Sequence, residues 1–231
     1  MNSHGLPLAD ELFLLGLEDP AASAQPRRPR LAADALGYLM GAALIAELVL
    51  AGCITVDHNV VYAVVDDHGA PVAGPPEGDD VLLGVYEHLR SECNGLDKWV
   101  PYLQLQDVAG SVAGRLRERG VLVGVERVGL RRRLVYRPAD PLWLSWRPVR
   151  LSNLLKQSAA LSLDDRVLLT LINACGLRQS VFPALTPEAS HYLDALLDEL
   201  RTSSEWRLRA VHQIAEQVKW LTNHSAFIPH V

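Results

Sequence analysis

"LGYLMGAALIAELVLAGCI", residues 36–54, is an almost unbroken apolar run, and its environment decides the fold. The run is just long enough to span a bilayer, and Gly37 and Gly41 form the small-xxx-small pair found between membrane helices. Glu47 lies in its second half, where a carboxylate is costly in lipid, and there is no second span to pair with it. We therefore predict a buried core helix, with a transmembrane helix as the less favoured alternative. In a core helix the glycines allow close helix packing, and Glu47 needs a polar partner.

Helical patterns flank this run. Residues 8–17 are apolar enough for a short helix or strand, and Asp79 or Asp80 is placed to cap a helix that continues to residue 93. Residues 99–119 repeat apolar side chains at helical spacing and end at Gly120, a residue type that favours helix termination, so we predict one continuous helix. The apolar stripe of this helix consists of Leu105, Val108, Val112 and Leu116.

The C-terminal third is also predicted to be helical. Ser162 and Thr186 each precede an apolar periodic segment and are typical N-cap residues, with Pro187 and an acidic first turn supporting the second helix. Residues 203–221 form an amphipathic helical pattern.

Two short β-hairpins complete the predicted fold. Residues 54–67 are rich in β-branched side chains around a turn at His58-Asn59. Residues 121–136 form a second hairpin, for which Gly129-Leu130 suits a two-residue type II′ turn. The fold class that follows is mainly α, a helical bundle core with peripheral β-hairpins, and we expect a single domain over residues 1–231.

Composition indicates a globular cytoplasmic protein. The chain has 231 residues, a net charge of -5 and a pI near 5.9, which does not favour a dedicated nucleic-acid binder. Its three cysteines are odd in number and lack metal-type spacing, so we expect reduced thiols that are mostly buried. The N-terminus has no basic flank before its short apolar stretch, so we do not expect a signal peptide.

The sequence contains no motif that carries catalysis. The acidic pairs Asp79-Asp80 and Asp164-Asp165 stand at predicted helix starts, where capping explains them better than acid–base chemistry. The eight histidines form neither H-E-x-x-H nor a Cys/His cluster, and no glycine-rich phosphate loop occurs. We therefore expect no metal, no cofactor and no enzymatic activity.

Cations are concentrated in one part of the chain. Ten of the 22 Lys and Arg residues lie between Arg115 and Arg150, and three of these are Arg131, Arg132 and Arg133, next to Leu130. A second cluster, Arg27, Arg28 and Arg30, lies in a Pro-rich loop. A structural explanation is that the hairpin charges are simply solvated, or that they keep an edge strand from pairing with another chain. A functional explanation is that they bind an anionic phospholipid membrane.

DNA binding is a further alternative. A helix, a glycine and an arginine-bearing hairpin are arranged like the recognition helix and wing of a winged-helix domain. The contacts to DNA in this alternative would be Gln104, Gln106, Arg115 and Arg117 together with the hairpin arginines. A protein-interaction module without lipid binding remains open as well.

Two stretches carry a family resemblance. "ALIAELVLAGCITV" and "RLRERGVL", together with the order of segments from "LPLADELFLLGL" onward, resemble the Golgi phosphoprotein 3 family in its actinobacterial form. The resemblance implies a mainly helical fold with peripheral hairpins. Eukaryotic members bind phosphatidylinositol 4-phosphate, sit on the Golgi membrane and recruit glycosyltransferases. The resemblance also implies homo-oligomerisation through the hairpin, here Val121 to Tyr136.

The chain departs from the family at the headgroup pocket. The family uses a Trp, an Arg six residues before its Glu, and an Arg-x-x-Arg pair, and these positions fall at Ala32, Gly41, Gln106 and Ala109. Without guanidinium partners a phosphate loses its strongest hydrogen bonds. Arg30 is the hypothetical replacement for one of them. We therefore expect a cytoplasmic, peripherally membrane-associated oligomer that contacts anionic lipid through Leu130 and Arg131–Arg133, and secondarily through Arg27, Arg28 and Arg30.

Overall fold

The computed structural model describes residues 5–17, 30–128 and 133–224, although for residues 125–128, 133 and 134 it describes the backbone alone. Within these ranges ten helices and two small antiparallel sheets form a mainly α protein, as predicted. The helices are α1 (Leu8–Leu15), α2 (Ala33–Leu50), α3 (Asp80–Ser91), α4 (Leu96–Leu105), α5 (Val108–Glu118), α6 (Leu142–Lys156), α7 (Leu163–Ala174), α8 (Arg178–Val181), α9 (Pro187–Thr202) and α10 (Trp206–His224). The strands are β1 (Ile54–Asp57), β2 (Val60–Ala63), β3 (Leu122–Val128) and β4 (Arg133–Pro138).

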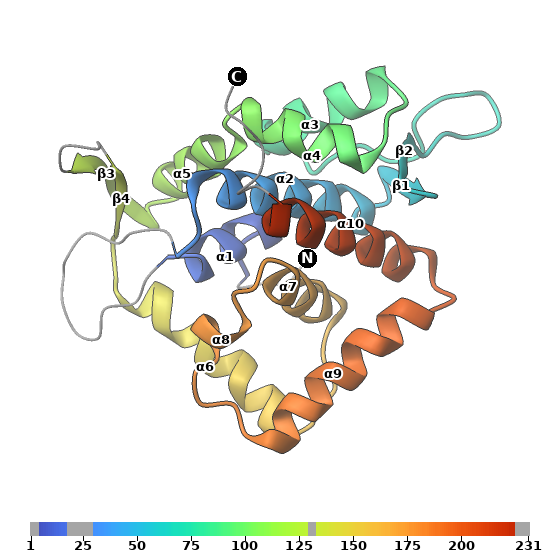
Figure 1. Cartoon of the computed structure of the whole chain (residues 1–231). Helices are drawn as coiled ribbons and strands as arrows, with labels where there is room; N and C mark the ends of the chain where they lie inside the picture. The colour runs from blue at the N-terminus through green and yellow to red at the C-terminus, as the bar shows by residue number, and fades with distance from the viewer. Residues whose placement is uncertain (1–4, 18–29, 129–132, 225–231) are drawn as a thin grey trace.

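Helix α2 lies at the centre of the bundle. It packs against α1, α4 and α10, and nearly all of its side chains are buried (Figure 1). In the part of the chain that the structure describes, α2 alone is long and apolar enough to cross a bilayer, with a mean hydropathy of 1.6, and 78% of it is buried inside the fold. The apolar run is therefore the core helix of the bundle.

The glycines of α2 set its distance from α4. A Cβ atom on Gly41 would lie 3.2 Å from Cβ of Leu103, and one on Gly37 would lie 2.5 Å from Cγ of Gln104. Any larger residue at Gly41 would have to displace the packed side chain of Leu103. The small-residue pair thus serves helix packing, as predicted.

The first hairpin confirms its predicted turn. β1 pairs with β2 from Ile54↔Ala63 to Asp57↔Val60, and His58 and Asn59 both have positive φ, at 47° and 66°. Two consecutive left-handed residues define a type I′ turn, which Asn tolerates.

The predicted helix over residues 99–119 is wrong, because the chain breaks between α4 and α5. Asp107 adopts φ 54° and ψ 42°, and its carboxylate accepts a hydrogen bond from the N–H of Gly110 at 3.2 Å. Asp competes with helix continuation by capping, and here it starts a new helix in a new direction. Leu105, which the single-helix pattern placed in the core, is 76% exposed.

Three predicted N-caps are confirmed. The side chains of Asp79, Ser162 and Thr186 each accept a hydrogen bond from the N–H three residues on. At the start of α9, the N–H of Glu188 itself and then the Thr186 hydroxyl donate hydrogen bonds to the Glu188 carboxylate and lower its pKa.

The second hairpin is described only along its strands. Its backbone register runs from Leu122↔Pro138 to Val128↔Arg133. The predicted turn at Gly129-Leu130 lies outside the described residues. The two hairpins lie at opposite ends of the molecule (Figure 1).

Candidate functional site

The base of the β3–β4 hairpin is fixed to the helical body. Gly120 ends α5 with φ +70°, which turns the chain into β3. The Tyr136 ring then meets the Phe13 ring of α1 edge-on, with 4.9 Å between the centroids, and Val121 and Leu122 are buried. The hairpin therefore projects from the edge of the molecule on an anchored base (Figure 1).

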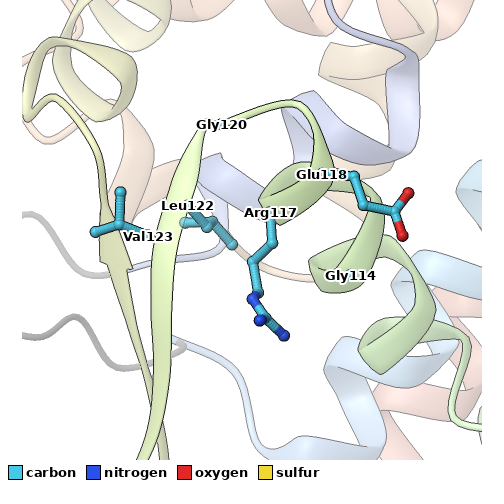
Figure 2. A pocket seen from close by; sticks show the side chains of 6 residues that line it. All are labelled: Gly114, Arg117, Glu118, Gly120, Leu122 and Val123. Atoms are coloured by element: carbon cyan, nitrogen blue, oxygen red, sulfur yellow. The ribbon is translucent and has the colours of Figure 1, made fainter.

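A notch of about 470 Å³ separates α5 from the base of β3. It is open to solvent and is lined by Gly114, Arg117, Glu118, Gly120, Leu122 and Val123. Figure 2 shows Arg117 extending along the gap, while Glu118 points away from β3. A single exposed guanidinium beside apolar side chains suits a weak anionic contact, and the lining residues offer no paired acid and base.

Most of the residues predicted to contact lipid lie outside the described residues. These are Arg27, Arg28, Leu130, Arg131 and Arg132, and for Arg133 the structure gives only its place at the start of β4.

Arg30 is described, and it fastens the chain to the helical body. Its Nε donates to the carbonyl of Leu17 at 2.8 Å, and its Nη1 donates to the carbonyl of Ser180 at 3.1 Å. These two donors are used within the fold, so they do not replace a missing phosphate ligand in this conformation.

The four aligned pocket positions carry no phosphate ligand. Ala32 is exposed before α2, Gln106 is exposed after α4, and Ala109 is half-buried in the first turn of α5. Gly41 is buried against α4, where a Cβ atom alone would lie 3.2 Å from Cβ of Leu103.

Two carboxylates occur at the helix starts near these positions. Asp34, in the first turn of α2, accepts a hydrogen bond from Gln104 at 3.2 Å, and Asp107 caps α5. Burial and then Asp34 raise the pKa of Tyr38, while burial and then Asp107 raise the pKa of Tyr136. The field of the two carboxylates opposes the binding of a phosphate here.

A buried ion cluster, which sequence reasoning missed, joins four helices. It consists of Asp10, Glu47, Asp79, Arg115 and Arg119. Arg115 donates to Asp10 at 2.8 Å and to Asp79 at 2.7 Å, and its Nη2 lies 3.8 Å from Glu47. Arg119 donates to Asp10 at 2.8 Å. The DNA-binding alternative needed Arg115 at the surface, and the structure buries it.

Burial dominates the electrostatics of this cluster. It raises the pKa of Glu47 to about 7, although Arg115 and a 2.7 Å hydrogen bond from the N–H of Ala9 act in the opposite direction. It also raises the pKa of Asp10 against the pull of Arg115 and Arg119. Burial alone would lower the pKa of Arg115, but Glu47 and then Asp10 raise it. The predicted need of Glu47 for a polar partner is confirmed, and the role of the cluster is to hold helices together.

Helix α6 begins where the hairpin ends and exposes an apolar face. Leu142, Trp146 and Val149 are 65%, 42% and 57% exposed, and we call these three side chains the α6 stripe. Beneath Trp146 lies the fully buried Arg147, whose guanidinium carbon is 5.1 Å from the indole centroid and whose Nη2 is 3.0 Å from Glu11. The hairpin and the first turns of α6 lie at the same edge of the molecule (Figure 1).

The residues that the structure describes contain no group of three His, Cys, Asp or Glu side chains that could hold a metal ion. Cys53 and Cys175 are buried, as expected, and burial raises the pKa of Cys175 to about 12. Cys93 is exposed.

Comparison with known proteins identifies the family. A comparison with curated proteins found no match. The family model described as Golgi phosphoprotein 3 (GPP34) matches residues 8–218, which run from the start of α1 into α10 and include the core helix and both hairpins. The chain therefore belongs to the Golgi phosphoprotein 3 (GPP34) family.

Proposed function

We propose that this protein is a non-enzymatic, cytoplasmic protein that associates peripherally with anionic phospholipid membranes through the β3–β4 hairpin. The observation that carries the proposal is the position of this hairpin, which projects from the edge of the bundle on a buried base. The sequence places Arg131, Arg132 and Arg133 at its far end. Family membership supports the same function, since membrane association is what the resemblance implies.

The hairpin charges alone give weak attachment. Each cation near an anionic surface contributes about 1 kcal/mol, so three contribute roughly 3 kcal/mol. That free energy corresponds to a dissociation constant on the order of several millimolar. Stronger attachment requires additional contacts, or an oligomer that presents several hairpins to one surface. We include homo-oligomerisation through residues 121–136 in the proposal for this reason.

The proposed specificity is for negative charge rather than for one headgroup. The aligned positions Ala32, Gly41, Gln106 and Ala109 provide no charged donor, and Asp34 and Asp107 occur beside them. Phosphatidylinositol 4-phosphate should therefore bind in proportion to its charge, as other anionic lipids do.

Vesicle sedimentation tests the proposal. The full-length protein is mixed with vesicles of phosphatidylcholine alone, with added phosphatidylserine, or with added phosphatidylinositol 4-phosphate. We expect both anionic vesicles to pellet the protein and the neutral vesicles not to. The triple variant Arg131→Ala, Arg132→Ala, Arg133→Ala should lose most of this binding.

A second triple variant controls for net charge. Arg90, Arg201 and Lys219 are each about half exposed, lie on other helices and form i,i+3 ion pairs there. Changing all three to Ala removes the same charge elsewhere and should leave vesicle binding intact. Equal losses in both variants, or no binding of the unchanged protein to either anionic vesicle, would refute the proposal.

A further inference from the structure

The α6 stripe is an ordered apolar surface with no cover from the described part of the chain. Leu142, Trp146 and Val149 follow the i, i+4, i+7 spacing of one helix face. The opposite face of α6 is buried, through Leu144, Arg147, Leu151 and Leu155. The helix is therefore fixed to the body by one face and presents three large apolar side chains to solvent with the other.

The charges on α6 itself do not oppose an anionic partner. The sequence has no Asp or Glu between Asp140 and Asp164, while Arg147, Arg150 and Lys156 lie in that interval. Arg147 pairs with Glu11 and Arg150 with Asp165, and Lys156 is exposed at the end of the helix. Asp140, which accepts a hydrogen bond from the N–H of Leu142, is an exposed carboxylate at the start of the stripe.

The central side chain of the stripe is held in place. The Trp146 indole lies over two guanidinium groups, 5.1 Å from that of Arg147 and 5.7 Å from that of Arg150. A tryptophan restrained in this way loses little conformational freedom on binding. Its amphipathic ring is suited to the headgroup level of a bilayer, where Trp is enriched.

The exposed area argues against a second copy of the chain as the partner. At the exposed fractions above, and at about 200 Å² for a large side chain, the stripe offers on the order of 300 Å². A stable interface buries about 800 Å² on each partner. Insertion into a bilayer has no such minimum, because a few side chains contribute in proportion to their area.

We infer that the α6 stripe is a second membrane contact, in which these three side chains enter the interface of an anionic bilayer beside the hairpin. The inference rests on the proposed function and supplies the additional attachment that three cations lack. Burial of a third of the stripe raises partitioning into the membrane on the order of 50-fold. The apolar contribution to membrane binding does not weaken as the salt concentration rises, whereas salt screens the contribution of the arginines.

Salt dependence separates the two contacts. Binding to phosphatidylserine vesicles is measured at about 0.1 M and about 0.5 M salt, where the screening length falls from ~10 Å to under ~5 Å. The unchanged protein should keep part of its binding at high salt. The variant Leu142→Ser, Trp146→Ser, Val149→Ser should lose that part and bind on the order of 50-fold more weakly at low salt. The hairpin triple-Ala variant should lose mainly the salt-sensitive part.

The chain offers a control of matched residue types. Leu83, Val72 and Trp220 are 45%, 61% and 53% exposed on other segments. Changing these three to Ser should leave binding unaltered at both salt concentrations. Circular dichroism and gel filtration establish that each variant is folded and has the same size.

Quenching by brominated lipid gives a readout that does not depend on a multiple variant. Bromine in the acyl chains should quench part of the tryptophan fluorescence of the bound protein. This quenching should be lost in Trp146→Phe and retained in Trp220→Phe.

The outcomes distinguish this inference from the proposed function. If the unchanged protein binds but the stripe variant binds equally well at both salt concentrations, or if quenching survives in Trp146→Phe, the inference is refuted and the hairpin contact stands. If the stripe variant is smaller in solution than the unchanged protein, the stripe contacts a second copy and the inference is refuted. If the unchanged protein binds no anionic vesicle, the proposed function itself is refuted.

Discussion

The buried carboxyl of Glu47 should make the stability of this protein fall as pH rises. Burial raises its pKa from 4.5 to about 7. Because the folded chain holds the proton more tightly than the unfolded chain within this window, raising the pH through it lowers the free energy of unfolding. At about 1.4 kcal/mol per pKa unit, the loss due to Glu47 is about 3 kcal/mol.

The substitution Glu47→Gln isolates this contribution. Glutamine has the shape of the protonated acid, and its side-chain oxygen can still accept the hydrogen bond from Ala9. The variant should match the unchanged protein near pH 4.5 and exceed its free energy of unfolding by about 3 kcal/mol at about pH 8. The difference between the two proteins is the quantity to use, because Asp10, whose pKa is also raised, adds a pH dependence of the same sign to both.

Urea unfolding followed by tryptophan fluorescence measures this difference at several values between about pH 5 and about pH 8. The difference should grow steadily with pH. A difference that stays within about 1 kcal/mol over this range would mean that Glu47 remains ionised in the fold. Burial would then not dominate the electrostatics of the buried ion cluster.

Three further substitutions test the packing and the helix caps. Arg115→Met removes the central guanidinium of the buried ion cluster and should lower the free energy of unfolding by about 3–5 kcal/mol. Arg119→Met, at a position that is 37% exposed, should lower it by less. Equal losses would contradict the central role of Arg115 in the cluster. Ser162→Ala removes the N-cap of α7 and should lower the free energy of unfolding by about 1 kcal/mol, measured by a thermal melt. An unchanged melting temperature would contradict a stabilising role for this cap. Gly41→Arg, which restores the family residue, should cost at least about 3 kcal/mol because the site is packed against α4. A gain in phosphatidylinositol 4-phosphate binding by Gly41→Arg would contradict that packing.

Local signals were sufficient to predict much of the fold. The caps at Asp79, Ser162 and Thr186 and the turn at His58-Asn59 depend on neighbours within a few residues, so their sequence patterns predict them directly. The core position of α2 follows from its apolar composition and from Glu47, the carboxylate inside the apolar run.

Competing local preferences caused the errors. Apolar periodicity predicts one helix through residues 99–119, but Asp107 prefers to cap and divides it into α4 and α5. No helix was predicted over residues 142–156, where α6 forms with Pro148 inside it, although proline is rare inside helices.

Long-range pairing limits what the sequence shows of the candidate site. The pattern around Arg115 is that of a surface helix, and its burial depends on Asp10 and Asp79, which are 105 and 36 residues away. The available hints were Glu47 and Asp10, two acidic residues inside apolar runs, which must find partners if the runs are buried. The exposed α6 stripe has only a weak signature, because Trp146 close after the cationic hairpin suits an interface but its residue type would serve equally well in a core.

The Asp10–Arg115 pair also constrains how the protein is made. The ribosome synthesises Asp10 105 residues before Arg115, an interval of about 5–20 s at ordinary rates of translation. Throughout this time the chain lacks Arg115, the guanidinium that neutralises Asp10 in the finished fold, where Asp10 is sealed from water. The first helix therefore cannot complete its buried ion pair until the fifth helix has left the exit tunnel.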